Sequence, residues 1–208
     1  PTSPGTLRLA VPAGANMRDI SGNPLNTASP ILDDTIITVG SEFFADGTWV
    51  LNSTDFWNNS VNWSNNIVAN GTDRSAFFTA DINPFNTIAL NAPRTIGNIT
   101  FTDAVSSHDL QLSGTSPLTL DRTSGRPDIN VTQTGRQLTL AGPIAGNDGL
   151  SKSGPGILRV RINDTFSGDI TINGGRLHTH LGVGTNYSNI SIASGAFSAI
   201  CRAISIVR

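Results

Sequence analysis

The chain has one cysteine, one lysine and few charged residues of either sign: 13% of its 208 residues are charged. A lone cysteine, Cys201, excludes an intramolecular disulfide and a zinc site built from several cysteines. The formal net charge is −2 and no basic stripe is present, so the chain lacks the electrostatic signature of a nucleic-acid-binding protein. No segment reaches the roughly 18 apolar residues that would span a membrane. We expect no cofactor, no nucleic-acid partner and no membrane span.

Helical periodicity is also missing. No stretch sustains the 3.6-residue apolar period of an amphipathic helix. Short runs alternate apolar and polar residues instead, and Gly, Asn, Asp, Ser and Pro lie between them, as strands and turns require. The clearest runs are IGNITF at 96–101, PLTL at 117–120, QLTL at 137–140 and ILRV at 157–160. This pattern predicts an all-β protein.

Composition divides the chain into three regions. Residues 1–42 contain strand-like runs around an Asp-x-x-Gly-Asn loop, and residues 43–103 hold all three tryptophans. Over residues 104–208 the aromatics thin out and short strands recur about every ten residues, which fits a sandwich, a barrel or the rungs of a β-solenoid. Periodicity therefore leaves the architecture open. The few strands of 1–42 cannot bury a core alone, so we expect them to pack on other protein.

Residues 149–177 contain a run that resembles one unit of the autotransporter-associated β-strand repeat. That family has Gly-Gly-Leu-x-Lys-x-Gly-x-Gly-x-Leu, followed by Asn-x-(Tyr/Phe)-x-Gly-x-(Thr/Asp)-x-(Val/Ile)-Asn-x-Gly-x-Leu. The matching residues are Gly149, Leu150, Lys152, Gly154, Gly156, Leu158, Asn163, Phe166, Gly168, Ile172, Asn173, Gly175 and Leu177. The resemblance implies a right-handed parallel β-helix.

The resemblance extends upstream and covers about residues 45–180. The segment that precedes such repeats in large bacterial surface proteins is similar to this chain at Trp49, Trp57, Asn62–Trp63, Ala76–Phe78 and Ala92–Phe101. Residues 1–42 resemble the closing strands of a bacterial immunoglobulin-like surface module. The C-terminal segment GAFSAICRAISIVR departs from the repeat pattern.

The ends of a β-helix expose unpaired backbone groups and need a cover. We expect the Trp-rich segment to form an N-terminal β-rich cap. At the other end, the last strand at Ala203–Val207, a neighbouring domain or another copy of the chain would provide the cover.

Few residues suggest a chemical site. Trp49, Trp57 and Trp63 could form a carbohydrate-stacking platform, although a role in filling the cap core is the simpler interpretation. His178 and His180 lie two residues apart, on one face of a strand, but no third metal ligand accompanies them. Cys201 lies in an apolar segment without a neighbouring histidine, which indicates a buried structural thiol.

Carboxylates could pair for glycoside cleavage, as polysaccharide-degrading β-helices require. The candidates are Asp33–Asp34, Asp148 and Asp164–Asp169, and all of them fall at expected turns, where bonding to the backbone explains them. No Gly-x-Ser-x-Gly elbow and no phosphate-binding loop is present. We assign no catalytic, cofactor-binding or metal-binding residue.

These observations favour a non-enzymatic extracellular protein of the bacterial cell surface. It would be structural or adhesive, acting as a rigid spacer or as a self-assembling filament subunit. Its partners would be copies of itself or neighbouring domains at the solenoid ends, and surface polysaccharide. The alternative is a polysaccharide-binding or polysaccharide-degrading β-helix protein, and a fragment of an autotransporter passenger is a third hypothesis.

Overall fold

The chain forms two units, Pro1–Glu42 and Phe43–Arg208. Our computed structural model describes residues 5–7, 10–18, 22–24, 26, 28, 31–32, 37–39, 44–162, 166–181 and 190–202. The described strands of the first unit form two antiparallel pairs. These pairs are β1 (Gly5–Leu7) with β4 (Ile37–Val39), and β2 (Ala10–Val11) with β3 (Ile31–Leu32). The immunoglobulin-like interpretation of this unit stays a prediction.

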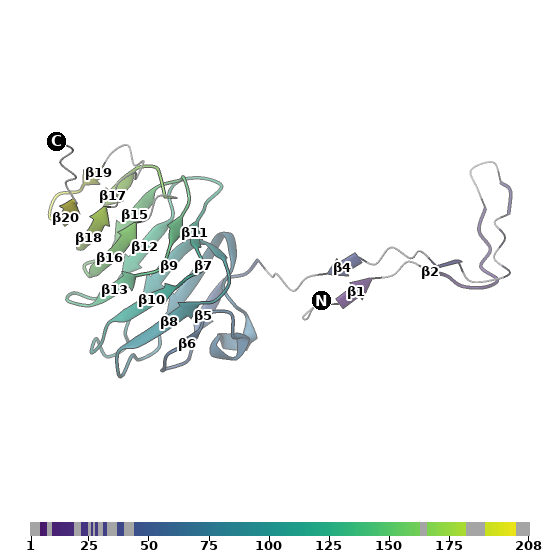
Figure 1. The fold of residues 1–208 in the computed structure, drawn as a ribbon, viewed down its shortest axis with the longest axis horizontal. Helices are drawn as coiled ribbons and strands as arrows, with labels where there is room; N and C mark the ends of the chain where they lie inside the picture. The colour runs from purple at the N-terminus through teal and green to yellow at the C-terminus, as the bar shows by residue number, and fades with distance from the viewer. Residues whose placement is uncertain are drawn as a thin grey trace. The chain divides into compact units, whose positions relative to one another are not determined.

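The second unit is a β-solenoid, in which strands from successive rungs stack in parallel (Figure 1). The first ladder consists of β6 (Asp55–Phe56), β8 (Asn86–Leu90), β10 (Leu110–Gly114), β13 (Gln137–Leu140), β16 (Ile157–Ile162), β18 (Arg176–Leu181) and β20 (Phe197–Arg202). The second ladder consists of β5 (Gly47–Trp49), β7 (Gly71–Phe78), β9 (Arg94–Phe101), β12 (Asp128–Val131), β15 (Leu150–Ser153), β17 (Ile170–Ile172) and β19 (Ile190–Ile192).

A third, shorter set of strands completes the rungs. The N-terminal half of β9 pairs with β11 (Leu118–Leu120), which pairs with β14 (Ile144–Ala145). The chain therefore runs repeatedly from one ladder to the next, and every pairing between named strands of this unit is parallel. The β-helix prediction is confirmed, and the sandwich and the barrel are excluded.

The core consists of side chains stacked at equivalent positions of successive rungs. Because side chains alternate between the two faces of a strand, every second residue points inward. One inward column contains Leu110, Leu138, Leu158 and Leu177, all with no exposed surface, and the strand register aligns them. A one-residue slip would expose such a column to solvent, so the alternation fixes the register.

Lys152 interrupts a second inward column, which also contains Ile99, Ile129 and Ile172. Its side chain is fully buried, and its Nζ donates to the carbonyl oxygens of Ser153, Gly154 (2.9 Å) and Gly174 (3.3 Å). All three N–H groups of the ammonium are thereby used. Lys152 joins the corners of two adjacent rungs from the inside.

We expect Lys152 to make stability rise with pH above pH 8. Burial lowers the pKa of Lys152 to about 8, and the Asp128 carboxylate opposes this effect. Between that value and the ordinary lysine pKa, the unfolded chain binds a proton that the folded chain has lost, so the free energy of unfolding should rise by roughly 2–3 kcal/mol. Urea unfolding at both ends of this range measures the rise. Lys152→Met should lack it, and equal pH dependence in the two proteins would contradict the prediction.

The N-terminal cap is formed by residues 44–70, which fold back over the first rung. Two short 3-10 helices, η1 (Ser60–Asn62) and η2 (Ser64–Asn66), turn the chain back on itself. As a result, Trp63 forms an isolated antiparallel β-bridge with Trp49, and Asn70 forms one with Ala45. The three indole N–H groups all donate to backbone carbonyls. The predicted β-rich cap is therefore confirmed, while the expected cover at Ala203–Val207 lies outside the described residues.

Candidate functional site

A polar groove of about 860 Å³ lies on the outer face of the second ladder. Its floor consists of side chains from three successive rungs: Asp128 of β12, Ser151 and Ser153 of β15, Thr171 of β17, and Asn173, which directly follows β17. Arg126 and Asp148, from the turns beside these strands, form its rim. We call these seven residues, together with Gly125, the polar groove.

Strand alternation and register together place the floor residues. Lys152 points inward, so its neighbours Ser151 and Ser153 point outward. The register aligns Asp128 with Ser151 and Ser151 with Thr171, on strands that are about 4.8 Å apart. The result is a row of oxygen-bearing side chains that crosses the rungs.

Hydrogen bonds between rungs hold the floor in place. Ser153 Oγ donates to Asp128 Oδ2 at 2.6 Å, and Asn173 Nδ2 donates to Ser151 Oγ at 3.0 Å. Asp128 Oδ1 is buried and accepts no hydrogen bond from the described residues. Each floor side chain keeps further donor or acceptor capacity, because hydroxyl and amide groups form several hydrogen bonds.

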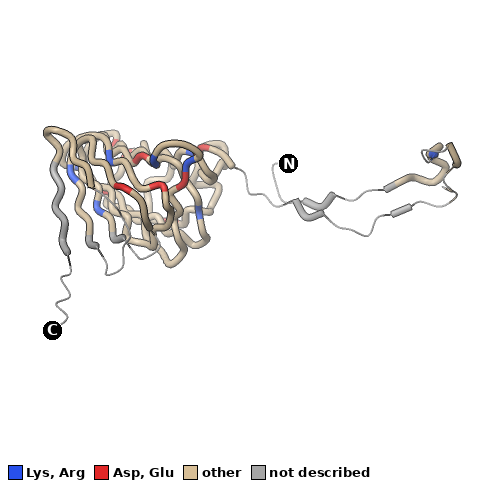
Figure 2. Tube along the Cα trace, turned by 90° about the horizontal axis from the view of Figure 1, so that it is seen from above, with Lys and Arg blue, Asp and Glu red and all other residues tan. Residues whose placement is uncertain are grey.

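The rim is held by charged contacts. Arg126 donates to Asp169 Oδ2 at 2.8 Å and to Thr171 Oγ1 at 3.3 Å, so its guanidinium lies along the edge of the groove. On the other side, Asp148 Oδ2 accepts the backbone N–H of Arg122 at 2.8 Å. Figure 2 shows acidic and basic residues close together along the solenoid. Among the lining residues, Asp128 and Asp148 outnumber Arg126, and the nearby Asp169 carboxylate and Lys152 ammonium offset one another, so the groove carries a net negative charge.

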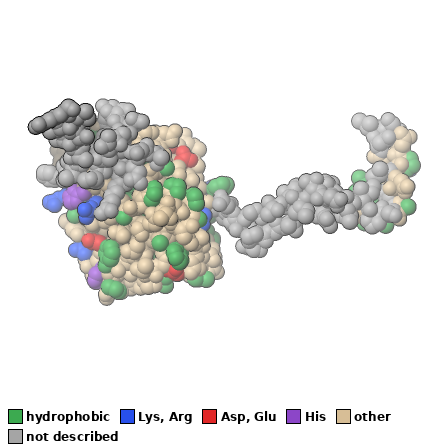
Figure 3. Space-filling model, viewed as in Figure 1, with side chains coloured by type: hydrophobic (Ala, Val, Ile, Leu, Met, Phe, Trp, Pro, Cys, Tyr) green, Lys and Arg blue, Asp and Glu red, His purple; other side chains and the backbone are tan. Residues whose placement is uncertain are grey.

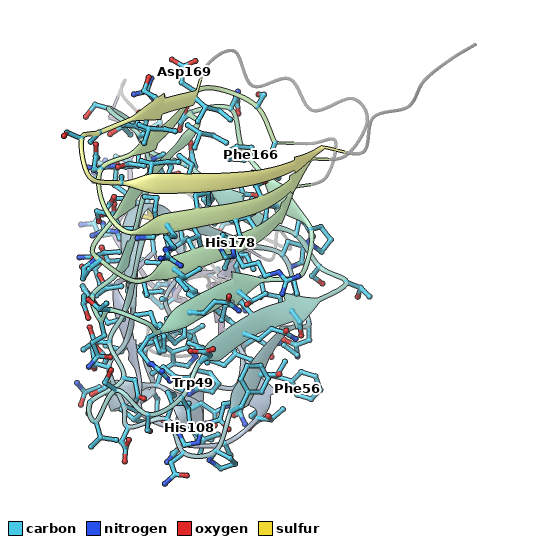
Figure 4. The ribbon with its side chains drawn as sticks, turned by 90° about the vertical axis from the view of Figure 1, so that its left-hand side faces the viewer. Trp49, Phe56, His108, Phe166, Asp169 and His178 are labelled. Carbon is cyan, nitrogen blue, oxygen red and sulfur yellow. The ribbon has the colours of Figure 1, made fainter. Side chains whose placement is uncertain are left out.

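The three tryptophans lie elsewhere, in the cap core. Trp49, Trp57 and Trp63 are 1%, 0% and 1% exposed. Trp63 packs edge-on to Trp49 with ring centroids 5.3 Å apart, and Trp57 packs on Phe78 at 5.5 Å. As the rings lie, none offers a face to a sugar (Figure 4 shows the position of Trp49). Their burial agrees with the interpretation that they fill the cap core.

The other candidate residues are dispersed or outside the described residues. Asp33, Asp34 and Asp164 are not described, and nothing is described of the side chains of His180 and Cys201. His178 is half-buried on β18, in the first ladder. Within the described ranges, no group of three or more His, Cys, Asp or Glu side chains is arranged to hold a metal ion.

Two of the acids named from the sequence, Asp148 and Asp169, both lie at the rim of the polar groove. Asp148 lines the polar groove and Asp169 pairs with its Arg126, and Asp128 joins them from β12. No motif in the sequence distinguishes Asp128, Arg126 or the serine and threonine residues of the floor. Most of them occupy outward positions in short strands, which the alternation of the sequence indicates. The register of the rungs, which the sequence does not give, is what brings them together.

Comparison with known proteins adds one similarity. A segment of 114 residues, 53% of this chain, is 34% identical to a protein named Adhesin BmaC autotransporter, from Brucella suis biovar 1 (strain 1330). The matched segment spans 3% of the length of that protein. No model of a known family matches the chain, and no solved structure matches it. The repeat family and the immunoglobulin-like module therefore stay resemblances.

The described part of the chain contains no helix that is long and apolar enough to cross a membrane.

Proposed function

We propose that this chain is part of a non-enzymatic adhesive protein on the bacterial cell surface. The observation that carries the proposal is the similarity of half the chain to an adhesin, in a chain that folds as a β-solenoid. A solenoid suits adhesion because it presents long outer faces, on which equivalent positions recur at every rung.

The solenoid would also serve as a rigid spacer. Each rung is joined to the next through backbone hydrogen bonds in two ladders, and its inward columns are apolar stacks that only Lys152 interrupts among the columns described above. Such a body bends little, because bending would separate hydrogen-bonded strands on one side. A binding surface on it would be held at a fixed distance from its anchor.

Copies of the chain or neighbouring domains would continue the ladders at the C-terminal end. Among the described strands, β19 and β20 each pair with one strand only, β17 and β18 respectively. A strand with a free edge is a template for pairing with another chain. This contact would allow self-assembly into filaments, or stacking on a further domain of the same protein.

An adhesion assay tests the proposal. Beads carrying the purified 208-residue chain should be retained under flow on at least one member of a panel of cultured cells, extracellular-matrix proteins and immobilised polysaccharides. Beads that carry the heat-unfolded chain are the control. If retention never exceeds that of the control on any surface, the adhesive function is wrong.

Polysaccharide binding is a second candidate function, favoured by the polar groove. Its hydroxyl, amide and carboxylate groups match the hydrogen-bonding pattern of sugars. A degrading enzyme with the same groove would release reducing sugar from a bound polysaccharide. We expect binding without release, and release that Asp128→Asn abolishes would favour the enzyme.

A further inference from the structure

We propose that the polar groove binds a glycan that is uncharged or carries amino groups, and that it rejects anionic glycans. The inference rests on polysaccharide binding, the second candidate function above, and it names the class of ligand. Its basis is the charge and the hydrogen-bonding capacity of the residues that line the groove.

The groove suits a ligand with many hydroxyl groups. The carboxylates of Asp128 and Asp148 only accept hydrogen bonds, whereas the hydroxyls of Ser151 and Thr171 and the amide of Asn173 both accept and donate. A sugar hydroxyl also does both, so it can pair with any of these groups. The floor residues come from three rungs, and a chain of sugar units lying across the rungs would meet a new set of partners at each one.

The charge of the groove selects against anions. Two carboxylates and one guanidinium line it, and the guanidinium of Arg126 is already paired with Asp169 at 2.8 Å. A uronic-acid or sulfated glycan would bring further negative charge next to Asp128 and Asp148, whereas the Arg126 and Lys152 cations nearby are already hydrogen-bonded to protein groups. An ammonium group would meet these carboxylates as a hydrogen-bonded ion pair.

The groove should bind each glycan weakly, so adhesion through it should depend on many copies of the chain acting together. Its lining contains no aromatic residue, so the stacking energy that rings supply is missing. Weak sites become effective when many are displayed together, because the second and later contacts are made at high local concentration. An array of such chains on a surface meets that condition.

The first ladder provides an internal contrast. Its outer face carries exposed Arg159 and Arg176, and the register places His178 beside Arg159. Figure 3 shows basic and histidine side chains near one another on the solenoid. Anionic glycans that bind this chain should therefore bind here, and their binding should not respond to changes in the polar groove.

The test uses isothermal titration calorimetry on the intact chain, with three oligosaccharides of equal length. These are glucosamine oligomers, N-acetylglucosamine oligomers and galacturonic-acid oligomers. At low salt we expect the amine-bearing oligomer to bind most tightly and the neutral one more weakly. The binding heat of the anionic oligomer should be the same for the wild-type chain and the groove variants. Salt at about 0.5 M should bring the first two affinities together, because it screens the ion pair.

Three variants locate the site. Asp128→Asn should weaken binding of the glucosamine oligomer about tenfold, because the negative charge that attracts the ammonium group is lost. Thr171→Lys should abolish this binding by placing a cation in the groove. Asp109→Asn is the matched control: this carboxylate is 36% exposed and lies 3.7 Å from Arg136, beside the first ladder. It should leave the affinity unchanged, and thermal unfolding checks that each variant is folded.

Three outcomes would overturn the inference. The amine-bearing and neutral oligomers do not bind, or the anionic oligomer binds more tightly than they do and Asp128→Asn changes its binding. The third is an equal loss of affinity for the glucosamine oligomer in Asp128→Asn and Asp109→Asn. The bead assay separates these failures from failure of the proposed function. If wild-type and Thr171→Lys beads adhere equally to all surfaces, the chain is adhesive and the groove is not its binding site.

Discussion

Trp57→Ala should lower the free energy of unfolding by about 3–5 kcal/mol, which is a large part of the stability of an ordinary domain. The Trp57 side chain has no exposed surface, and its ring centroid lies 5.0 Å from that of Trp63. Its Nε1 donates to the carbonyl oxygen of Ala69 at 3.0 Å. The substitution would empty the centre of the cap and leave that carbonyl without its donor.

Phe56→Ala is the matched control for this prediction. Phe56 precedes Trp57 directly and is also aromatic, but half of its side chain is exposed. It lies at the outer edge of the cap in Figure 4. Because little apolar surface returns to water, its truncation should cost about 1 kcal/mol or less. Urea unfolding followed by far-ultraviolet circular dichroism gives both values, and equal losses would mean that the cap core does not stabilise the solenoid.

The tryptophan cluster was predictable as a cap, but its packing was not. Three tryptophans in a chain of few aromatics, placed just before the short recurring strands, indicated a compact apolar cluster at the N-terminal end. The Trp49 ring could have been exposed to a ligand or packed against Trp63. The outcome depends on the turn that η1 and η2 form, because this turn brings Trp63 back to Trp49. That turn depends on Asn62, whose Nδ2 donates to Asp55 Oδ2 at 3.0 Å and to the carbonyl of Phe56 at 3.2 Å. No sequence pattern predicts these contacts.

The solenoid itself followed from resemblance and not from periodicity. Alternating strands with glycine turns occur in sandwiches, barrels and solenoids alike, because all three bury one face of each strand. Lys152 illustrates the difference. Strict alternation from Leu150 places it inward, which is unfavourable for a charged group, and only the carbonyls of the two stacked corners make that position tolerable.

Asp103 is a buried charged group that no sequence pattern predicts. Its carboxylate accepts the backbone N–H groups of Ile82 at 2.8 Å, Ser107 at 2.5 Å and His108 at 2.8 Å, and so anchors two loops. Desolvation alone would raise the pKa of Asp103, but these hydrogen bonds outweigh it and hold the pKa below its ordinary value. An aspartate at a turn is common, and its burial depends on partners that are distant in sequence.

The polar groove was the least predictable feature. Asp128, Ser151 and Thr171 are far apart in sequence, and each alone is an ordinary outward residue of a strand. They become neighbours because rungs of unequal length still align their strands. Loop residues such as Arg126, which lies in the connection between β11 and β12, absorb the difference in length. Sequence spacing does not encode this alignment.

Gly149→Ala should destabilise the fold by about 3 kcal/mol or more, because the added methyl group collides with the neighbouring rung. Gly149 has φ +76°, and a Cβ at this position would lie 2.0 Å from the carbonyl oxygen of Asp169 and 2.8 Å from its nitrogen. That oxygen accepts the backbone N–H of Leu150 at 2.9 Å. Relief of the collision would therefore separate β15 from β17 at the edge of the polar groove.

Gly135→Ala separates the collision from the backbone strain. Gly135 has almost the same φ, +79°, but a Cβ there would meet no atom within 4 Å. It should cost only the strain of a side chain in the left-handed region, about 1 kcal/mol. The difference between the two variants in urea unfolding measures how closely the rungs are held at the Gly149 corner. Equal losses would show that this corner relaxes freely, and the rigidity required of a spacer would then have to come from the ladders alone.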